Sequence, residues 1–397
     1  MQESDRQPSG RHGQDWPAYY ASQVNEKALF FTTLNELRKE VVEPEYVTGH
    51  PPFPLGDMVF GLVYKVYSNL SSQRFQYDLR EAHAKGLISV APSPNTLSEY
   101  MRDESLTDVL RQLVTKSSLP LAGAETVFAA DSTGFSVPIR RNWFNRHKNR
   151  QEKRRDYMKL HVMIGVGSNI ITCAEPSVGS ANDGTFLRRL IGGTARYFDI
   201  SEVSADAGYL SGENMHAVVL AGAIPYIAFK SNCALDADYK STFWKDMLYL
   251  YKTRHPRFMN HYYLRNNVEA TFASMKAKFD GRLRSKSTTG QFNEALCKAI
   301  CHNICVLIHS MHELRIDPTS WAGVQVRLEA PAGLTAAELE RVRGNLAEIK
   351  KAAAERERYV EERVSKHVQR PRKARRRAAR RHPNPGQASL FESRGRP

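Results

Sequence analysis

The strongest constraint on the fold comes from residues 126–230, where short apolar segments alternate with helical ones. Segments rich in β-branched and aromatic residues and bounded by turn residues are typical of strands, and the Gly-Ser-Asn sequence at 167–169 predicts a hairpin turn. Strands followed by helices in this order predict a mixed α/β sheet domain. We expect strands within 126–137, 159–175 (two strands), 201–210 and 224–230, and helices at 183–193, ended by glycine, and 211–223.

Helical patterns precede this region. Apolar residues at helical spacing predict helices at 16–43, 55–70, 74–85 and 93–103. Several compact helices in one basic chain suit a helix-turn-helix DNA-binding module, and they also suit a helical packing or dimerisation domain. We predict a helical DNA-binding domain at 16–120, with the packing domain as the alternative.

Helical patterns also follow the sheet region, over residues 262–314. The last part of the chain, 319–397, combines a charged, Ala-rich helical stretch with an Arg-rich run, and its end is predicted to be disordered. Residues 1–15 are predicted to be disordered as well. The chain is thus expected to contain a helical N-terminal domain, an α/β domain at 121–318 and a helical and disordered basic extension.

The balance of charge points to a polyanionic partner. Lys and Arg outnumber Asp and Glu by 57 to 42, which gives a net charge of +15. The Arg-rich run at 370–381 supplies eight of these cations, and the rest of the chain still carries +7. Nucleic acid is the commonest partner of so basic a chain, and double-stranded DNA is the partner we expect.

Other bulk features bear on location. The sequence has no apolar run of about 18 residues, so we expect no membrane span. Its five cysteines are too few to indicate a disulfide framework and fit a reducing cytoplasm. Cys297, Cys301 and Cys305 recur every four residues and would share one face of a helix, where we expect them to be core residues rather than zinc ligands.

The most basic internal segment lies at 140–155. Aromatic residues stand among its cations, and this combination suits phosphate contact with base stacking, whereas a solvated loop is the alternative. Without an anion, so many like charges would repel one another. DNA contacts are predicted for Arg140, Arg141, Trp143, Arg146 and Lys148.

Lys159 and His161 follow this segment at alternate positions of a predicted strand, so they share one face. Both are predicted to face DNA, with His161 lining a pocket; a hydrogen-bonded histidine within the sheet is an equal alternative. Asp183, at the start of a predicted helix, is expected to cap its first turn rather than bind a metal.

Two acidic residues are predicted to end strands. Asp131 follows one apolar segment and Asp206 another, and each is followed by small residues that leave room for a ligand. Carboxylates at strand ends lie where an α/β sheet usually opens onto a ligand crevice. We therefore predict that both carboxylates belong to one site.

A third acid, Glu269, is predicted to project from a helix docked on the sheet. Val268, Phe272, Met275 and Phe279 would form the apolar stripe of that helix. Glu269 would share another face with Tyr262, Arg265 and Lys276. A surface ion pair between Arg265 and Glu269 is the alternative explanation.

Together the three carboxylates predict a site for hard divalent cations. Mg²⁺ prefers carboxylate oxygens and retains waters. Two such ions about 4 Å apart promote in-line phosphoryl transfer. We predict Asp131, Asp206 and Glu269 as catalytic residues and ligands of two Mg²⁺ (or Mn²⁺) ions, with nearby cations binding the phosphates.

These segments resemble the bacterial insertion-sequence DDE transposases (the IS4/IS5-like superfamily). Tyr262, Arg265, Glu269 and Lys276 match the Y-x2-R-x3-E-x6-K signature, while ADSTGF around Asp131 and DAGY from Asp206 are similar to the two Asp segments. The resemblance covers roughly residues 50–315 and implies an RNase H-like catalytic domain that binds terminal inverted repeats. It also implies that Tyr262, Arg265 and Lys276 contact DNA beside the scissile phosphate.

The function predicted from the sequence is therefore transposition: metal-dependent cleavage at transposon ends, then attack of the freed 3′-hydroxyl on target DNA. Because two DNA ends must be brought together, a homodimer on DNA is expected. Two other classes remain compatible with the sequence: a catalytically silent DNA-binding protein descended from a transposase, and an RNase H-like nuclease without strand transfer.

Overall fold

The computed structural model describes residues 15–45, 52–137, 157–231, 233 and 242–319. The DNA contacts predicted for Arg140, Arg141, Trp143, Arg146 and Lys148 lie outside these residues. So do the predicted disorder of the N-terminus up to residue 14 and the charged helix and basic tail from residue 320 onwards.

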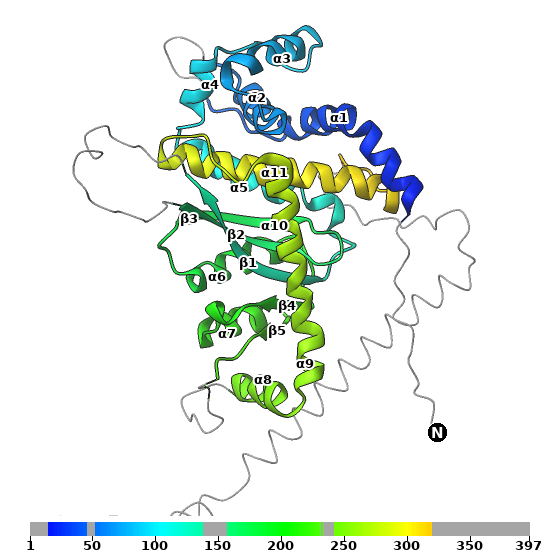
Figure 1. Ribbon diagram of the computed structural model, residues 1–397, viewed down its shortest axis with the longest axis vertical. Coiled ribbons are helices and arrows are strands. Elements are labelled where there is room, and N and C mark those ends of the chain that lie inside the picture. Colours follow the sequence, from blue (N-terminus) through cyan, green and yellow to red (C-terminus); the bar gives the residue numbers. More distant parts are fainter. Residues whose placement is uncertain (1–14, 46–51, 138–156, 232, 234–241, 320–397) are drawn as a thin grey trace, which may run out of the picture. The chain divides into compact units, whose positions relative to one another are not determined.

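A five-stranded mixed sheet forms the centre of the described fold (Figure 1). Its strands are β1 (Val127–Ser136), β2 (Tyr157–Gly165), β3 (Ile171–Val178), β4 (Glu202–Ala205) and β5 (Ile224–Ile227). They lie in the order β3-β2-β1-β4-β5, with β2 antiparallel to β1 and β3, and with β1, β4 and β5 parallel. The predicted mixed α/β sheet and its hairpin turn at 167–169 are confirmed.

Alternation along the strands gives the sheet two apolar faces. On one face, Ala129 and Phe135 of β1 join the core formed with α5 (Ser105–Lys116), α10 (Asn266–Phe279) and α11 (Thr288–Leu314). On the other face, Phe128 and Ala130 join the core formed with α6 (Leu187–Ala195) and α7 (Gly212–Leu220). The same second core includes α8 (Thr242–Thr253) and α9 (His255–Tyr262).

The N-terminal helices share the first of these cores. They are α1 (Trp16–Arg38), α2 (Leu55–Ser68), α3 (Ser72–Ala84) and α4 (Pro94–Tyr100), as the apolar spacing predicted. Both α1 and α2 pack along α11, which lies between them and the sheet (Figure 1). Their apolar residues and those of one sheet face therefore belong to one continuous cluster.

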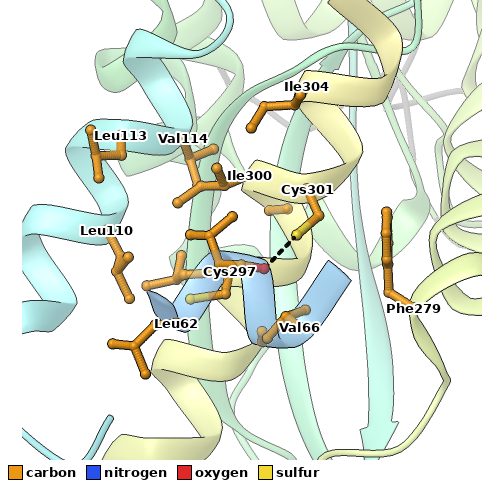
Figure 2. Packing of buried hydrophobic residues seen from close by; sticks show 14 of the residues in the cluster. Leu62, Val66, Leu110, Leu113, Val114, Phe279, Cys297, Ile300, Cys301 and Ile304 are labelled. Carbon is orange, nitrogen blue, oxygen red and sulfur yellow. Dashed lines mark hydrogen bonds between the residues drawn. The ribbon is translucent and has the colours of Figure 1, made fainter. Parts of the chain in front are cut away.

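Helix α11 is buried along most of its length. Figure 2 shows Cys297, Ile300, Cys301 and Ile304 of this helix packed among side chains of α2 and α5. Cys297 and Cys301 are fully buried, and the Cys301 thiol donates to the carbonyl of Val63. Burial raises the pKa of both thiols, which keeps them protonated. The prediction that these cysteines are core residues is confirmed for Cys297 and Cys301, and Cys305 is partly buried against the same core.

Asn303 ties α11 to two neighbouring elements through buried polar contacts. Its amide nitrogen donates to the carbonyls of Ile171 (2.7 Å) and Val114 (3.1 Å), and its amide oxygen accepts from the N–H of Ile171 (2.9 Å). These bonds satisfy the backbone groups of Ile171 at the start of β3 and give the Val114 carbonyl a second donor beside the Ser117 hydroxyl.

Three local predictions were wrong. Strand β1 does not end at Asp131 but continues to Ser136, because residues 131–136 pair with β2 after the pairing with β4 has stopped. Helix α6 passes through Gly193, whose missing side chain lets the helix approach Cys173: a Cβ there would lie 2.6 Å from the sulfur. The helical segment 262–314 is interrupted between α10 and α11, where Asp280 has a positive φ of 68°.

Among the residues that the structure describes, no helix is long and apolar enough to cross a membrane.

Candidate active site

Asp131 and Asp206 occupy equivalent positions on neighbouring parallel strands. The pairing between β1 and β4 ends with Ala130 opposite Ala205, and Asp131 and Asp206 are the next residues of the two segments. Burial raises the pKa of Asp131, and the nearby Asp206 carboxylate raises it further, while the Ser132 N–H and Arg265 act in the opposite direction. The two carboxylates therefore interact electrostatically, although the sequence separates them widely.

The backbone turn after β4 fixes the Asp206 side chain. Asp206 is the N-cap of a 3-10 turn, Ala207–Tyr209, and its Oδ1 accepts from the Gly208 N–H at 2.6 Å. A Cβ on Gly208 would lie 2.9 Å from that oxygen. The glycine of the DAGY segment thus makes room for the carboxylate of Asp206 itself.

Arg265 links Asp131 to Glu269. Its guanidinium donates to Asp131 Oδ2 at 2.7 Å and to Glu269 Oε1 at 3.1 Å. The Asp131 and Arg265 side chains are 17% and 16% exposed, whereas that of Glu269 is 62% exposed. The ion pair between Arg265 and Glu269, which was the alternative explanation for this helix face, is present, and it forms part of a bridge between two carboxylates.

The four signature residues do not lie on one uninterrupted helix. Tyr262 ends α9, Arg265 ends a 3-10 turn (Tyr263–Arg265), and Glu269 and Lys276 belong to α10. The Arg265 guanidinium lies over the Tyr262 ring at 5.7 Å from its centroid. The Lys276 amine instead lies 5.5 Å from the centroid of the Phe135 ring, near the end of β1, and burial lowers its pKa. The apolar stripe Val268, Phe272, Met275 and Phe279 is buried, as predicted.

A second charged group lies on the opposite face of the sheet. Because Ser132 pairs with His161 while Asp131 pairs with Val162, alternation directs Ser132, Lys159 and His161 toward the α6 face. There the Lys159 amine donates to Asp183 Oδ1 at 2.7 Å, and the Ser132 hydroxyl donates to Asp183 Oδ2 at 3.1 Å. Asp183 is therefore held by two elements of the sheet.

His161 is fully buried beside this group. Its ring stacks on Phe186 with centroids 3.9 Å apart, its Nε2 lies 2.8 Å from Ser177 Oγ, and its Nδ1 lies 3.8 Å from Asp183. Burial is the main cause that lowers the pKa of His161 to about 4, so the ring is neutral at neutral pH. In this position the ring packs between Phe186 and Asp183 and has no solvent-accessible surface for a ligand.

Tyr209 interacts electrostatically with carboxylates of both charged groups. Its side chain is buried, and burial together with the charges of Asp131, Asp183 and Asp206 raises the pKa of its hydroxyl. All three Asp carboxylates thus act on one phenol. The sequence did not indicate roles for Ser132 and Tyr209, and it indicated Asp183 only as a cap. The shared strand face of Lys159 and His161 was the available signal, because it predicts a common partner, which is Asp183 in the structure.

The donor set suits a hard divalent cation. No group of three or more His, Cys, Asp or Glu side chains within the described ranges is close enough to hold one ion. Mg²⁺, however, is commonly bound through one or two carboxylates together with waters and substrate phosphates. The neighbouring carboxylates of Asp131 and Asp206 meet that requirement, and the Arg265 bridge shows that a cation is stabilised between Asp131 and Glu269.

Comparison with known families agrees with this arrangement. Residues 122–304 match the family model described as the transposase DDE domain. The matched segment is somewhat less than half of the chain, and it contains all five strands, Asp131, Asp206 and Glu269. A DDE transposase domain is therefore what this part of the chain is similar to.

Comparison with individual proteins adds little to the DDE match. No curated protein is significantly similar to the chain. A solved structure described as a cryo-EM structure of the piggyBac transposase synaptic complex with hairpin DNA shares 14% identity, over 82% of this chain and 84% of that one, with a TM-score of 0.34. A likeness at this score fixes neither fold nor function.

Proposed function

We propose that this protein is a DDE transposase that cleaves DNA at transposon terminal inverted repeats and transfers the freed ends into target DNA. The observation that carries the proposal is the placement of Asp131 and Asp206 at equivalent positions of adjacent parallel strands, with Glu269 joined to Asp131 through Arg265. A bacterial insertion sequence is the proposed source of the element, on the basis of the Y-x2-R-x3-E-x6-K signature.

The proposed catalytic domain is RNase H-like. The sheet order β3-β2-β1-β4-β5, with only β2 antiparallel to its neighbours and helices on both faces, supports this proposal. In such a sheet, β1 and β4 are parallel neighbours. The proposed site lies at the edge of the sheet beside the carboxyl end of β4.

Asp131, Asp206 and Glu269 are the proposed ligands of two Mg²⁺ or Mn²⁺ ions. When bound, these ions would activate the attacking oxygen and stabilise the leaving oxygen of the phosphodiester. Burial raises the pKa of Asp131, and the neighbouring Asp206 carboxylate also raises it, which supports placing cations between these two acids. Because the ions act directly on water or a hydroxyl, no covalent bond between protein and DNA is proposed.

The cations of the site have separate proposed roles. Arg265, which donates one hydrogen bond to each of two carboxylates, has a planar guanidinium that also fits a phosphate. The Tyr262 ring stacks against its guanidinium. Lys276 and Lys159 are proposed to contact DNA phosphates on either side of the scissile bond, with Lys159 positioned by Asp183.

The arrangement of the site also limits what Asp183 does. Both of its oxygens are engaged, one by Lys159 and one by Ser132. Its proposed role is therefore to position Lys159 and to add negative charge near Tyr209, while the ions are left to the other three acids.

The proposal is tested by a strand-transfer assay with Mg²⁺ and DNA fragments from both flanks of the gene. Glu269→Gln is expected to abolish cleavage. Glu213→Gln is the matched control, because Glu213 also lies in the first turn of a helix and pairs with an arginine, Arg188, at 3.1 Å. Wild-type cleavage by Glu269→Gln would show that the assignment of the three acids is wrong.

A dimer on DNA is part of the proposal, because two ends must be joined to one target. Sedimentation of the protein with end DNA is expected to show complexes with two protein chains. Complexes containing one chain only would exclude this part of the proposal but would not bear on the assignment of the three acids.

A further inference from the structure

A cavity of about 420 Å³ lies away from the three acids, beside the starts of α3 and α11. Its lining includes residues from the end of α2, the segment after α10 and the first turns of α11. None of Asp131, Asp206 and Glu269 lines it. Its charged lining residues are five cations and one carboxylate: Lys65, Arg102, Arg284, Lys286, Lys298 and Glu294.

The single carboxylate of this cavity is already used by the backbone. Glu294 accepts from the N–H of Arg284 at 2.9 and 3.0 Å and from the N–H of Ser285 at 2.8 Å. These bonds fix the turn that leads into α11. Glu294 therefore neutralises part of the charge of the cavity but has no direct ion pair with a cation among the described residues.

Two of the cations, Arg284 and Lys298, also stabilise the backbone around the cavity. Arg284 donates to the carbonyls of Asn69 and Leu70 and to the Asn69 side chain, at 2.7–2.9 Å. Lys298 donates to the carbonyls of Phe279, Asp280 and Arg282, at 2.6–2.8 Å. These bonds neutralise neither cation, because a carbonyl oxygen accepts a hydrogen bond without contributing a negative charge.

The other three cations have no such partners. Within the described ranges, the side chains of Lys65, Arg102 and Lys286 make no hydrogen bond and no ion pair. Arg102 and Lys286 are exposed, whereas Lys65 is partly buried on α2. Burial lowers the pKa of Lys65, and the nearby Arg284 lowers it further against the effect of Glu294. Unpaired cations that converge on one cavity favour an anionic ligand.

The helix that begins at the cavity supplies further donors. The N-cap of α3, Ser71, makes no side-chain cap bond, and Ser71 and Ser72 both line the cavity. Free N–H groups and hydroxyls at the start of a helix suit the several oxygens of a phosphate. The cavity volume exceeds that of a single phosphate ion and accommodates a phosphate with its attached sugar.

We propose that this cavity binds backbone phosphates of DNA, through Lys65, Arg102 and Lys286, at a distance from the cleavage site. The inference rests on the proposed function, because transposition supplies the DNA. It assigns the α2–α3 and α10–α11 junctions to the DNA-binding surface. It also predicts a contribution to DNA affinity that depends neither on the base sequence of the DNA nor on a metal ion.

The test measures binding rather than cleavage. A fluorescein-labelled duplex of about 30 base pairs and arbitrary sequence is titrated with the full chain, without divalent metal, at several KCl concentrations. For Arg102→Gln/Lys286→Gln, the slope of log affinity against log salt is expected to fall in magnitude by about 0.9 for each lost phosphate contact, or about 1.8 in total. Arg196→Gln/Lys230→Gln is the matched control, since both cations are exposed and lie outside the cavity.

A second variant removes the concern about folding. Ser72→Asp places a carboxylate in the first turn of α3, where it stabilises the helix, and at the same time it repels an anion from the cavity. We expect raised or unchanged thermal stability with about ten-fold weaker duplex binding. Wild-type slope and affinity in both cavity variants would overturn the proposal.

Inorganic phosphate distinguishes DNA from a small phosphate compound as the source. Wild-type protein whose thermal stability rises with phosphate, with no rise in Ser72→Asp and no change in duplex binding, would overturn DNA as the ligand. These outcomes are separate from failure of the proposed transposase. Loss of cleavage alone in Glu269→Gln leaves this inference standing, whereas a wild-type chain that binds no duplex removes both.

Discussion

Two polar clusters of this protein are built in opposite ways. At the candidate active site, charged side chains pair with one another: Arg265 with Asp131 and Glu269, and Lys159 with Asp183. Along α11, polar side chains such as Asn303 and Lys298 are buried and bond mainly to backbone groups. Side-chain pairs at a partly exposed edge can exchange partners when a ligand arrives, whereas a buried bond to the backbone has no alternative.

The difference assigns the two clusters to different tasks. Changes at the edge should alter chemistry more than stability, because the side chains there keep some contact with solvent. Changes along α11 should alter stability, because a buried N–H or carbonyl loses its partner.

The largest effect is expected for Asp131→Asn. The change removes a negative charge from the edge of the sheet while keeping the shape of the side chain, so we expect DNA cleavage to fall by at least about 10³-fold. The unfolding free energy should change by less than about 1 kcal/mol. Single-turnover cleavage and urea unfolding measure the two quantities, with exposed Asp199→Asn as the control. Equal losses of activity and stability would contradict the contrast.

The next largest effect is expected for Asn303→Ala. It removes the Asn303 bonds to the N–H and carbonyl of Ile171, and the carbonyl of Val114 keeps only the Ser117 hydroxyl, which should lower the unfolding free energy by about 2–4 kcal/mol. Cleavage per folded molecule should stay unchanged. Urea unfolding measures the loss, and Asn25→Ala on the exposed side of α1 is the control. A loss below about 0.5 kcal/mol would mean that water replaces these bonds.

A smaller effect is expected for Arg265→Gln. If Arg265 and a divalent cation compete for Asp131, removal of the guanidinium should increase Mn²⁺ affinity by about five-fold, which corresponds to one partly exposed ion pair. Cleavage should fall at the same time, because the phosphate loses a contact. Calorimetric titration with Mn²⁺ checks the first effect. A lower Mn²⁺ affinity would show that Arg265 organises the carboxylates rather than competing for them.

The smallest effect is expected from His302 on α11, which donates from Nε2 to the carbonyl of Asn169. Burial lowers the pKa of His302 below its ordinary value of 6.5, so the folded protein holds the neutral ring. The unfolded chain therefore takes up the proton first, and stability is complete above pH 6.5 and decreases as the pH falls below it. His302→Gln keeps a donor and should show a weaker loss of stability between pH 6.5 and 5. An unchanged pH dependence would exclude His302 as its source.

Much of the local structure could be predicted from the sequence. The helices predicted at 16–43, 55–70 and 74–85 are present at 16–38, 55–68 and 72–84, and apolar segments bounded by turn residues located the strands. The burial of Val268, Phe272 and Cys301 followed from helical periodicity. Local patterns are reliable where one face of an element is buried over several turns or residues, because side-chain direction then repeats with the backbone period.

Predictions failed where a distant segment decided the outcome. Gly193 does not end α6, because Cys173 on β3 requires close approach at that point. Asp131 does not end β1, because β2 continues to pair after β4 has stopped. In both places the local sequence favoured a break, and a neighbouring element compensated for it.

The sequence by itself indicated the candidate residues: three acids in order, a signature of Tyr, Arg, Glu and Lys, and an excess of cations. Only the tertiary structure decided how they are grouped. Strand pairing brings Asp131 beside Asp206, alternation assigns Lys159 and His161 to the opposite face, and Arg265 reaches Asp131 across 134 residues of chain. Charge and periodicity are properties of a segment, whereas distances between carboxylates and cations arise when the sheet and its helices pack together.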